Sequence, residues 1–514
     1  MNNNPNIYLW TKRGDSSKVN IQDIPEIKYD SKSFSEKISK LSEEAVKNKK
    51  KSSMERLKNN PTLKDIVSAD NPNKYPIVRE FIKDRSRKVY GGIAINSYLP
   101  ESEKIYGTED IPDYDFYSPD PWNDAVSLAN IFHKKGYKFV EARAGMHKGT
   151  YKVLVDLWPV ADISYMPKKE YDMVETTVKD GIHFVSPLKL LESMYKEFSE
   201  PFANPTRWPK VAIREKLIQK WTQPVENIKC SEDIFTQKIL SETQVKLLER
   251  CKEYIEKKGL IYSGGVAYNT YMDLADSNKR VSVENYTVLS EKASEDVKDL
   301  FTILIKKTDK LNITSHFYPS RELNNTVYRI YLVGKDKNTL LIEIVNLTSC
   351  TPFQKIGQKY VVALDYLFYE LYDSAVFADT EDDRHNYRCK VKYLSEVQKQ
   401  YYRKNNIGEL DQSPFKRFFT TCKGAFGENI KINILEKMIE REKEKPKTYY
   451  RKGYKIKIFK ESEKSEECKN KEKHSCSYPC IWGKRGECID IPKGVYRPGE
   501  EDSPEYTGSG RYED

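Results

Sequence analysis

Residues 88–96 read Lys-Val-Tyr-Gly-Gly-Ile-Ala-Ile-Asn, and residues 261–269 repeat the pattern as Ile-Tyr-Ser-Gly-Gly-Val-Ala-Tyr-Asn. In each copy an apolar run meets two glycines and then continues with helical spacing, which predicts a strand, a tight turn and a helix. Gly264 follows Gly91 by 173 residues. Because similar patterns at a fixed spacing indicate an internal repeat, this stretch predicts a duplicated unit.

The similarity extends well beyond the two glycines. Asp-Tyr-Asp-Phe-Tyr-Ser at 113–118 is matched by Asn-Tyr-Thr-Val-Leu-Ser at 285–290. An amphipathic helix, a strand pair and a closing helix are predicted after each copy, at 121–135, 151–156, 160–165 and 187–198, and at 293–307, 327–333, 339–347 and 359–372. The predicted fold class is α/β (α+β), a duplicated domain in which a mixed sheet is flanked by helices.

Length and composition define the frame around this repeat. The chain has 514 residues, enough for several domains, and its 87 basic against 77 acidic side chains give a net charge of +10. This balance favours a polyanionic partner. We predict five regions: a basic N-terminal arm (1–70), a first unit (71–230), a second unit (231–395), a basic C-terminal region with a cysteine cluster (396–496) and an acidic disordered tail (497–514).

The chain has no apolar stretch of 18 residues and no secretory signal pattern at its start, so we expect no membrane association. Five of the nine cysteines are scattered singly, which is typical of reduced thiols inside a cell. The other four cluster near the C-terminus, where structural zinc, disulfides and free thiols are all open alternatives; they are Cys468, Cys476, Cys480 and Cys488.

Three carboxylates of the first unit are the candidates for chemistry. Asp113 and Asp115 are two residues apart, so on an extended strand they project from the same face. Asp162 lies on a later predicted strand that could pair beside them, and Asp156 is an alternative third member. Clustered carboxylates suit Mg²⁺, and a Gly-Gly turn at a helix start suits a phosphate. The ordered set predicts a nucleotidyl-transfer site.

This ordered set resembles the DNA polymerase beta-type nucleotidyltransferases, and more closely the poly(A) polymerase catalytic subunits of poxviruses and giant nucleocytoplasmic DNA viruses. The resemblance implies that Gly91 and Gly92 hold the nucleotide phosphates. It also implies that Asp113, Asp115 and Asp162 are catalytic metal ligands for Mg²⁺ or Mn²⁺. ATP and an RNA 3′ end are the implied substrates, in the virion and the host cytoplasm (viral factory). A homodimer or a separate processivity subunit is a further expectation.

The same resemblance implies a second domain without the catalytic acids. The second unit has Asn285 and Thr287 where the first has Asp113 and Asp115, and Glu343 answers Asp162. An amide and a hydroxyl lack the negative charge that holds Mg²⁺. The second copy is therefore predicted to be degenerate.

A basic stretch follows the first unit's closing helix. Arg207 and Lys210 are predicted to meet nucleotide phosphates or the RNA backbone, because cationic side chains pair well with phosphate oxygens. Arg214, Lys216 and Lys220 are predicted to form a solvated helix face.

The predicted activity is that of a polynucleotide adenylyltransferase, which adds AMP from ATP to RNA 3′ ends by a two-metal mechanism. Two alternatives remain: a nucleotidyltransferase that uses another nucleotide or acceptor, and a non-catalytic RNA-binding subunit.

Overall fold

The computed structural model describes residues 71–424 apart from short internal gaps at 108–111, 138–139, 146–148, 157, 202–206, 309, 318–325, 335–336, 348 and 420–421. Outside this range it describes three strand pairs: β1 (Ile7–Trp10) with β2 (Ser16–Val19), β18 (Thr448–Arg451) with β19 (Tyr454–Lys457), and β20 (Cys480–Trp482) with β21 (Cys488–Asp490). The predicted tail at 497–514 and, apart from β1 and β2, the predicted N-terminal arm lie outside the described residues.

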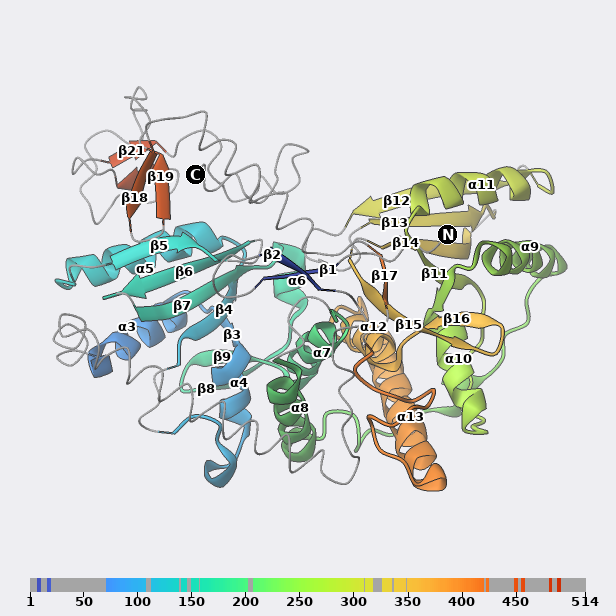
Figure 1. Ribbon diagram of the computed structural model, residues 1–514, viewed down its shortest axis with the longest axis horizontal. Helices are drawn as coiled ribbons and strands as arrows, with labels where there is room; N and C mark the ends of the chain where they lie inside the picture. The colour runs from blue at the N-terminus through green and yellow to red at the C-terminus, as the bar shows by residue number, and fades with distance from the viewer. Residues whose placement is uncertain are drawn as a thin grey trace.

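The first unit is a seven-stranded mixed sheet with helices around it (Figure 1). Its sheet order is β5-β6-β7-β4-β3-β9-β8, and only the β4–β7 and β3–β9 pairs are parallel. In chain order its elements are α3 (Asn71–Asp84), β3 (Lys88–Tyr90), α4 (Gly91–Tyr98), β4 (Tyr114–Ser118), α5 (Pro121–Lys134), β5 (Val140–Ala144), β6 (Thr150–Val155), β7 (Trp158–Tyr165), α6 (Lys168–Met173), β8 (Thr176–Lys179), β9 (Ile182–Val185), α7 (Pro187–Phe198) and α8 (Trp208–Thr222).

The second unit repeats this topology. Its sheet order is β12-β13-β14-β11-β10-β16-β15, with a short β17 (Cys422–Lys423) added at the edge. Its elements are α9 (Glu242–Lys258), β10 (Ile261–Ser263), α10 (Gly264–Leu274), β11 (Tyr286–Ser290), α11 (Ala293–Ile305), β12 (Leu311–Phe317), β13 (Thr326–Leu332), β14 (Thr339–Asn346), β15 (Thr351–Ile356), β16 (Lys359–Val362), α12 (Leu364–Val376) and α13 (Glu381–Asn405). The seven strands match one to one, so the predicted duplicated α/β fold is confirmed.

One predicted boundary is wrong. The closing helix of the second unit begins at Leu364 instead of residue 359, because residues 359–362 form strand β16. Val361 and Val362 are fully buried there, and β-branched residues with such burial favour a strand. Helix α12 therefore corresponds to α7, and β16 corresponds to β9.

Alternating burial along β4 explains how the site is placed. Tyr114, Phe116 and Ser118 are buried, whereas Asp115 and Tyr117 are only half-buried. Phe116 packs on Phe81 of α3 with ring centroids 6.2 Å apart. Side chains alternate between the two faces of a strand, so one face of β4 enters the core and the other carries the polar residues.

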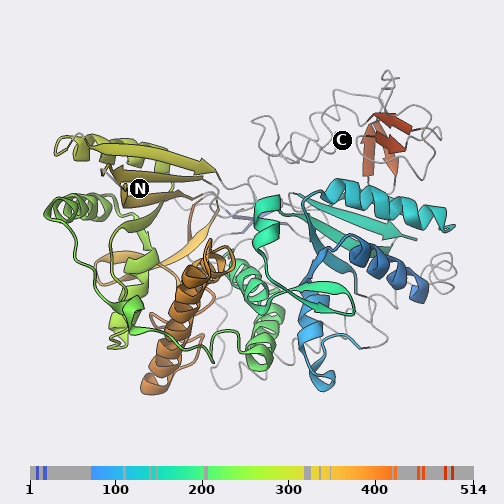
Figure 2. The ribbon, with the colours of Figure 1, turned by 180° about the vertical axis from the view of Figure 1, so that it is seen from behind.

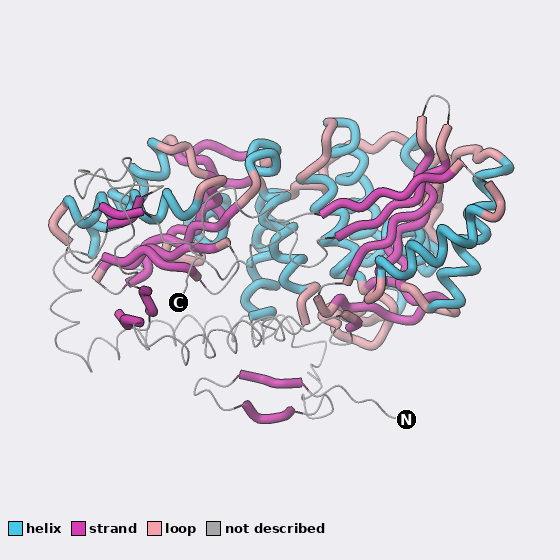
Figure 3. The backbone as a smooth tube through the Cα atoms, turned by 90° about the horizontal axis from the view of Figure 1, so that it is seen from above, coloured by secondary structure: helices cyan, strands magenta, loops and turns pink. Residues whose placement is uncertain are grey.

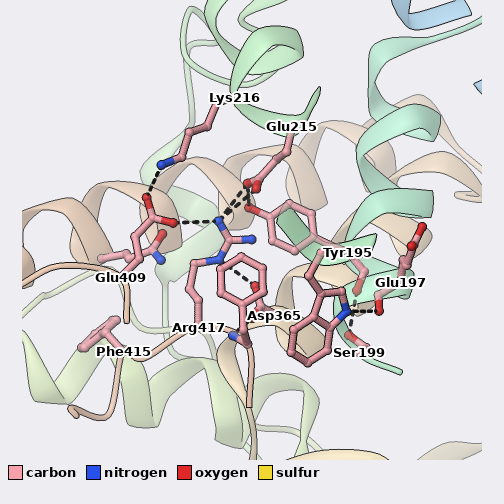
Figure 4. A network of polar contacts seen from close by, with 12 residues as sticks. Tyr195, Glu197, Ser199, Glu215, Lys216, Asp365, Glu409, Phe415 and Arg417 are labelled. Atoms are coloured by element: carbon pink, nitrogen blue, oxygen red, sulfur yellow. Dashed lines mark hydrogen bonds and ion pairs between the residues drawn. The ribbon is translucent and has the colours of Figure 1, made fainter. Parts of the chain in front are cut away.

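The two units lie side by side and meet through α7 and α12, which pack against each other in the centre of the molecule (Figures 2 and 3). A buried arginine reinforces this contact (Figure 4). Arg417 donates to Glu215 of α8 at 3.0 Å and to Asp365 of α12 at 2.7 Å. Arg417 therefore joins a carboxylate of the first unit to one of the second. Removing it would leave both buried carboxylates unpaired, which is costly in free energy.

The single cysteines depart from the prediction. Cys230 is bonded to Cys389, and Cys350 to Cys422, with Cα–Cα distances of 5.8 and 5.3 Å. The expectation of reduced thiols is therefore wrong for these four; Cys251 is the free cysteine of the described residues and is buried. The partners are 159 and 72 residues apart, so single spacings could not reveal them.

The zinc prediction is untested by this structure. Cys468 and Cys476 lie outside the described residues, and Cys480 and Cys488 are described only as backbone in β20 and β21. Zinc at these four residues therefore stays a prediction. Among the described residues no helix has the length and apolarity to cross a membrane.

Candidate active site

The three predicted aspartates converge. Asp113, Asp115 and Asp162 each offer one carboxylate oxygen, and these oxygens lie within 4.8 Å of one another. Asp115 and Asp162 are direct neighbours across the parallel β4–β7 pair, and Asp113 directly precedes β4. The chain therefore builds a compact acidic cluster on the half-buried face of the sheet.

The Gly-Gly turn lies directly beside this cluster. Gly91 has φ +69°, a left-handed conformation that favours glycine, and a Cβ at this position would collide with the carboxylate of Asp115. Helix α4 begins at Gly91, so its unpaired backbone N–H groups start next to the aspartates. Such a helix start attracts anions, as a phosphate site requires.

The cluster has the electrostatics of a cation site. Burial, together with the charges of Asp113 and Asp162, raises the pKa of Asp115 to about 8. Burial also raises the pKa of Asp162, although Lys152 opposes it. The Oδ1 atom of Asp162 is buried and has no hydrogen-bond partner in the described part of the chain. Three hard oxygen donors, one of them unsatisfied, fit Mg²⁺ or Mn²⁺.

Asp156, the alternative third member, is placed elsewhere. It follows β6 in the turn before β7, with φ 50°, and its carboxylate forms a 2.8 Å ion pair with Lys74 of α3. Both side chains are largely buried. Asp156 therefore joins α3 to the sheet, and Asp162 is the residue that lies beside Asp115.

Two groups near the cluster were missed from sequence. Lys152 lies opposite Asp162 across the β6–β7 pair and forms an ion pair with it. Tyr90 stacks on Tyr117 with ring centroids 4.1 Å apart, and its hydroxyl contacts Ser164 at 2.7 Å. The signal for Lys152 was strand register, which a single sequence specifies poorly.

The basic residues at the start of α8 lie near a carboxylate. Arg207 forms a 3.1 Å ion pair with Glu197, and the charge of Lys210 also acts on Glu197, so their contact with phosphates or RNA stays a prediction. Arg214, predicted to lie on a solvated face, is instead half-buried, and its charge partly opposes the rise in the pKa of Asp115 that burial causes. The prediction is wrong for Arg214 because α8 packs against α4, turning this residue towards the cluster.

The second unit has the same framework without the acids. Thr287 takes the place of Asp115 beside Gly264, and Glu343 takes the place of Asp162. Arg329 pairs with Glu343 at 2.6 Å across β13 and β14, as Lys152 pairs with Asp162. The expected degeneracy is confirmed: one carboxylate, already neutralised by an arginine, remains at this position.

Known proteins share sequence with this chain, and the segment in common includes the three aspartates. Residues 76–204 match the sequence profile of the family described as "Poly(A) polymerase catalytic subunit". A mimivirus protein assigned as a poly(A) polymerase catalytic subunit is 27% identical over 411 residues, covering 70% of this chain and 69% of its own length. A protein of the same description from African swine fever virus is 35% identical over 152 residues, 28% of this chain and 32% of its own.

A solved structure shares the architecture. The crystal structure of the Megavirus polyadenylate synthase aligns with a TM-score of 0.66 and 22% identity, covering 87% of this chain and 95% of that one. Fold and site together are those expected of a nucleotidyltransferase with one complete and one degenerate unit. Within that class, the chain is similar in sequence to viral poly(A) polymerase catalytic subunits, and the predicted resemblance is confirmed by the profile match over residues 76–204 and by the mimivirus relative.

Proposed function

We propose that this chain is a template-independent poly(A) polymerase that transfers AMP from ATP to the 3′-hydroxyl of mRNA and releases pyrophosphate. The observation that carries the proposal is the convergence of Asp113, Asp115 and Asp162 beside the glycine turn that starts α4. The same cluster lies within the segment that matches the poly(A) polymerase catalytic subunits.

The protein's own groups would position the reactants. The first turn of α4 would receive the triphosphate on its backbone N–H groups, which Gly91 leaves uncovered. Asp113, Asp115 and Asp162 would hold the divalent ions, and Lys152 would hold Asp162 in place. Bound in this way, two divalent ions would activate the primer hydroxyl and stabilise the departing pyrophosphate. The remaining task of the protein is alignment of hydroxyl and phosphate.

Primer extension tests the proposal. The wild-type chain is incubated with an oligoadenylate RNA primer, Mg²⁺ and each nucleoside triphosphate separately. We expect extension with ATP, and we expect Asp113→Ala combined with Asp115→Ala to abolish it while circular dichroism stays unchanged. Extension by the double variant would contradict the assignment.

The same assay separates the alternatives. Equal or better extension with another nucleotide, or extension of a different acceptor only, would identify another nucleotidyltransferase. Absence of any transfer alongside tight RNA binding would identify a non-catalytic subunit. Light scattering on the purified chain tests the expected homodimer; a monomer would favour a separate processivity subunit.

A further inference from the structure

A second polar group approaches the phosphate side of the turn. The loop after α4 folds back onto this helix, where the side-chain carbonyl oxygen of Asn96 accepts from the backbone N–H groups of Ile105 and Tyr106 at 2.9 and 3.3 Å. This clamp places the Tyr106 hydroxyl so close to Gly92 that a Cβ on that glycine would collide with it. The second glycine of the turn is thus required by Tyr106, as the first is by Asp115.

Arg214 joins Tyr106 from another helix. Its guanidinium donates to the Tyr106 hydroxyl at 3.1 Å and lies 5.9 Å from the centre of the tyrosine ring. No carboxylate in the described part of the chain lies within ion-pair distance of Arg214, although its charge acts on Glu197. Because its charge also reaches Asp115, Arg214 lies near both the acidic cluster and the start of α4.

The second unit provides an internal comparison. Asn269 clamps its own loop in the same way, exchanging hydrogen bonds with the backbone of Val281 at 2.9 and 2.8 Å. The side chain held against Gly265, however, is Val281, with a methyl carbon 3.5 Å from the Cβ position. The fold therefore accepts an apolar residue here, and the tyrosine–arginine pair occurs in the unit that retains the acids.

We propose that Tyr106 and Arg214 bind the β- and γ-phosphates of the incoming nucleoside triphosphate, an inference that rests on the proposed function. The Tyr106 hydroxyl donates one hydrogen bond to a phosphate oxygen. The planar guanidinium of Arg214 donates two, in the fork geometry that suits phosphate. Both groups are substrate-positioning residues, and they discriminate a triphosphate from a monophosphate.

Nucleotide binding without RNA tests this pair. The full chain with Mg²⁺ is titrated with ATP and with AMP, and Kd is measured for the wild type, Arg214→Ala, Arg214→Lys and Tyr106→Phe. Loss of a hydrogen-bonded charge on phosphate predicts about a 10- to 100-fold weaker Kd for ATP in Arg214→Ala. We expect partial rescue in Arg214→Lys, a roughly threefold loss in Tyr106→Phe, and an AMP Kd that changes by less than about threefold.

Lys220→Ala is the matched control. Lys220 lies on the same helix and forms a 2.7 Å ion pair with Glu103 of the same loop, but both groups are partly exposed. This variant removes a helix–loop contact outside the turn and is expected to bind ATP as the wild type does. If Arg214→Ala weakens the binding of ATP and AMP equally, or weakens neither, the proposal is overturned.

The two proposals fail in different ways. If the wild type binds ATP with the expected dependence on Arg214 but does not extend RNA, the proposed function is wrong and the phosphate assignment stands. If it extends RNA and Arg214→Ala binds ATP normally, only the phosphate assignment is wrong. If the wild type binds no ATP, both are wrong. A large loss of thermal stability in Arg214→Ala would transfer the decision to Arg214→Lys and Tyr106→Phe.

Discussion

The first and second units have the same strand order, yet their glycine turns contact different carboxylates. In the first unit, Gly91 faces Asp115, which belongs to an acidic cluster. In the second, the N–H of Gly264 and the hydroxyl of Ser263 both donate to the carboxylate of Glu370 from α12. The helix start that receives an external anion in our proposal is thus occupied internally in the second unit.

Glu370 gives the helix start of the second unit a hydrogen-bond partner within the protein. An unfilled helix start would leave backbone N–H groups unpaired, and burying such groups costs free energy. The position in α7 that corresponds to Glu370 is Ser193. The correspondence follows from strand register, because β9 pairs with β3 as β16 pairs with β10, and α7 and α12 follow these strands. The second unit therefore pairs this helix start with its own carboxylate, where our proposal has an external anion in the first unit. The following substitutions test this contrast.

The largest effect is expected from the matched pair Asp162→Asn and Glu343→Gln. Asp162→Asn removes a carboxylate charge from the one group of described residues whose oxygens could together hold a metal ion, so we expect AMP incorporation to fall by at least about a thousandfold. Glu343→Gln alters the corresponding position in the second unit and should change the rate by less than about twofold. Steady-state primer extension measures both, and comparable losses in the two variants would contradict the contrast.

The next effect concerns the two glycine turns. Alanine at either Gly91 or Gly264 places a side chain at positive φ, which costs about 1 kcal/mol of stability in both cases. At Gly91 the new methyl also displaces Asp115, and such a misplacement of catalytic groups lowers the rate by about 100-fold. At Gly264 the nearest atom is the Thr287 hydroxyl at 3.1 Å, and activity should be retained. Chemical denaturation and primer extension together separate the two costs.

Divalent ions should stabilise the folded protein by binding to the first unit only. Millimolar Mg²⁺ relieves the repulsion among three clustered carboxylates, so we expect it to raise the melting temperature of the wild type by about 2–5 °C. Asp115→Asn should abolish most of this shift, whereas Thr287→Ala should preserve it. A full Mg²⁺ shift in Asp115→Asn would place the ion elsewhere. Differential scanning fluorimetry with and without Mg²⁺ makes the measurement.

The smallest effect is a pH dependence located in the second unit. Burial raises the pKa of Glu370 to about 7, above its ordinary value of 4.5. A raised carboxyl pKa gives stability that is present below the ordinary value and is lost as pH rises through 7. The melting temperature of the wild type should therefore fall, relative to that of Glu370→Gln, by a few degrees between pH 5 and pH 8.

A control variant isolates that dependence. Glu242 is exposed and pairs with Lys246 one helical turn away, so Glu242→Gln should follow the wild-type pH profile. Glu370→Gln should also retain full AMP incorporation, because the residue lies outside the acidic cluster. Parallel pH profiles for the wild type and Glu370→Gln would show that the carboxyl does not titrate in this range.

Local patterns in the sequence predicted much of this molecule. Residues two apart on a strand share a face, so the spacing of Asp113 and Asp115 is enough to place them together. The repeated Gly-Gly turn predicted the duplication, because a strand, a turn and a helix are each indicated by residues that are close in sequence. These inferences concern neighbours along the chain, and the sequence determines them by itself.

Contacts between distant residues were decided only by the tertiary structure. The pairing of Tyr106 with Arg214 joins residues 108 positions apart, and the Cys230–Cys389 bond joins residues 159 apart. Glu370 reaches Gly264 only because α12 packs against α10. No periodicity encodes such encounters, because they depend on strand register and on the angles at which helices pack. The sequence by itself determined which unit carries the acids; the packing decided what surrounds each glycine turn.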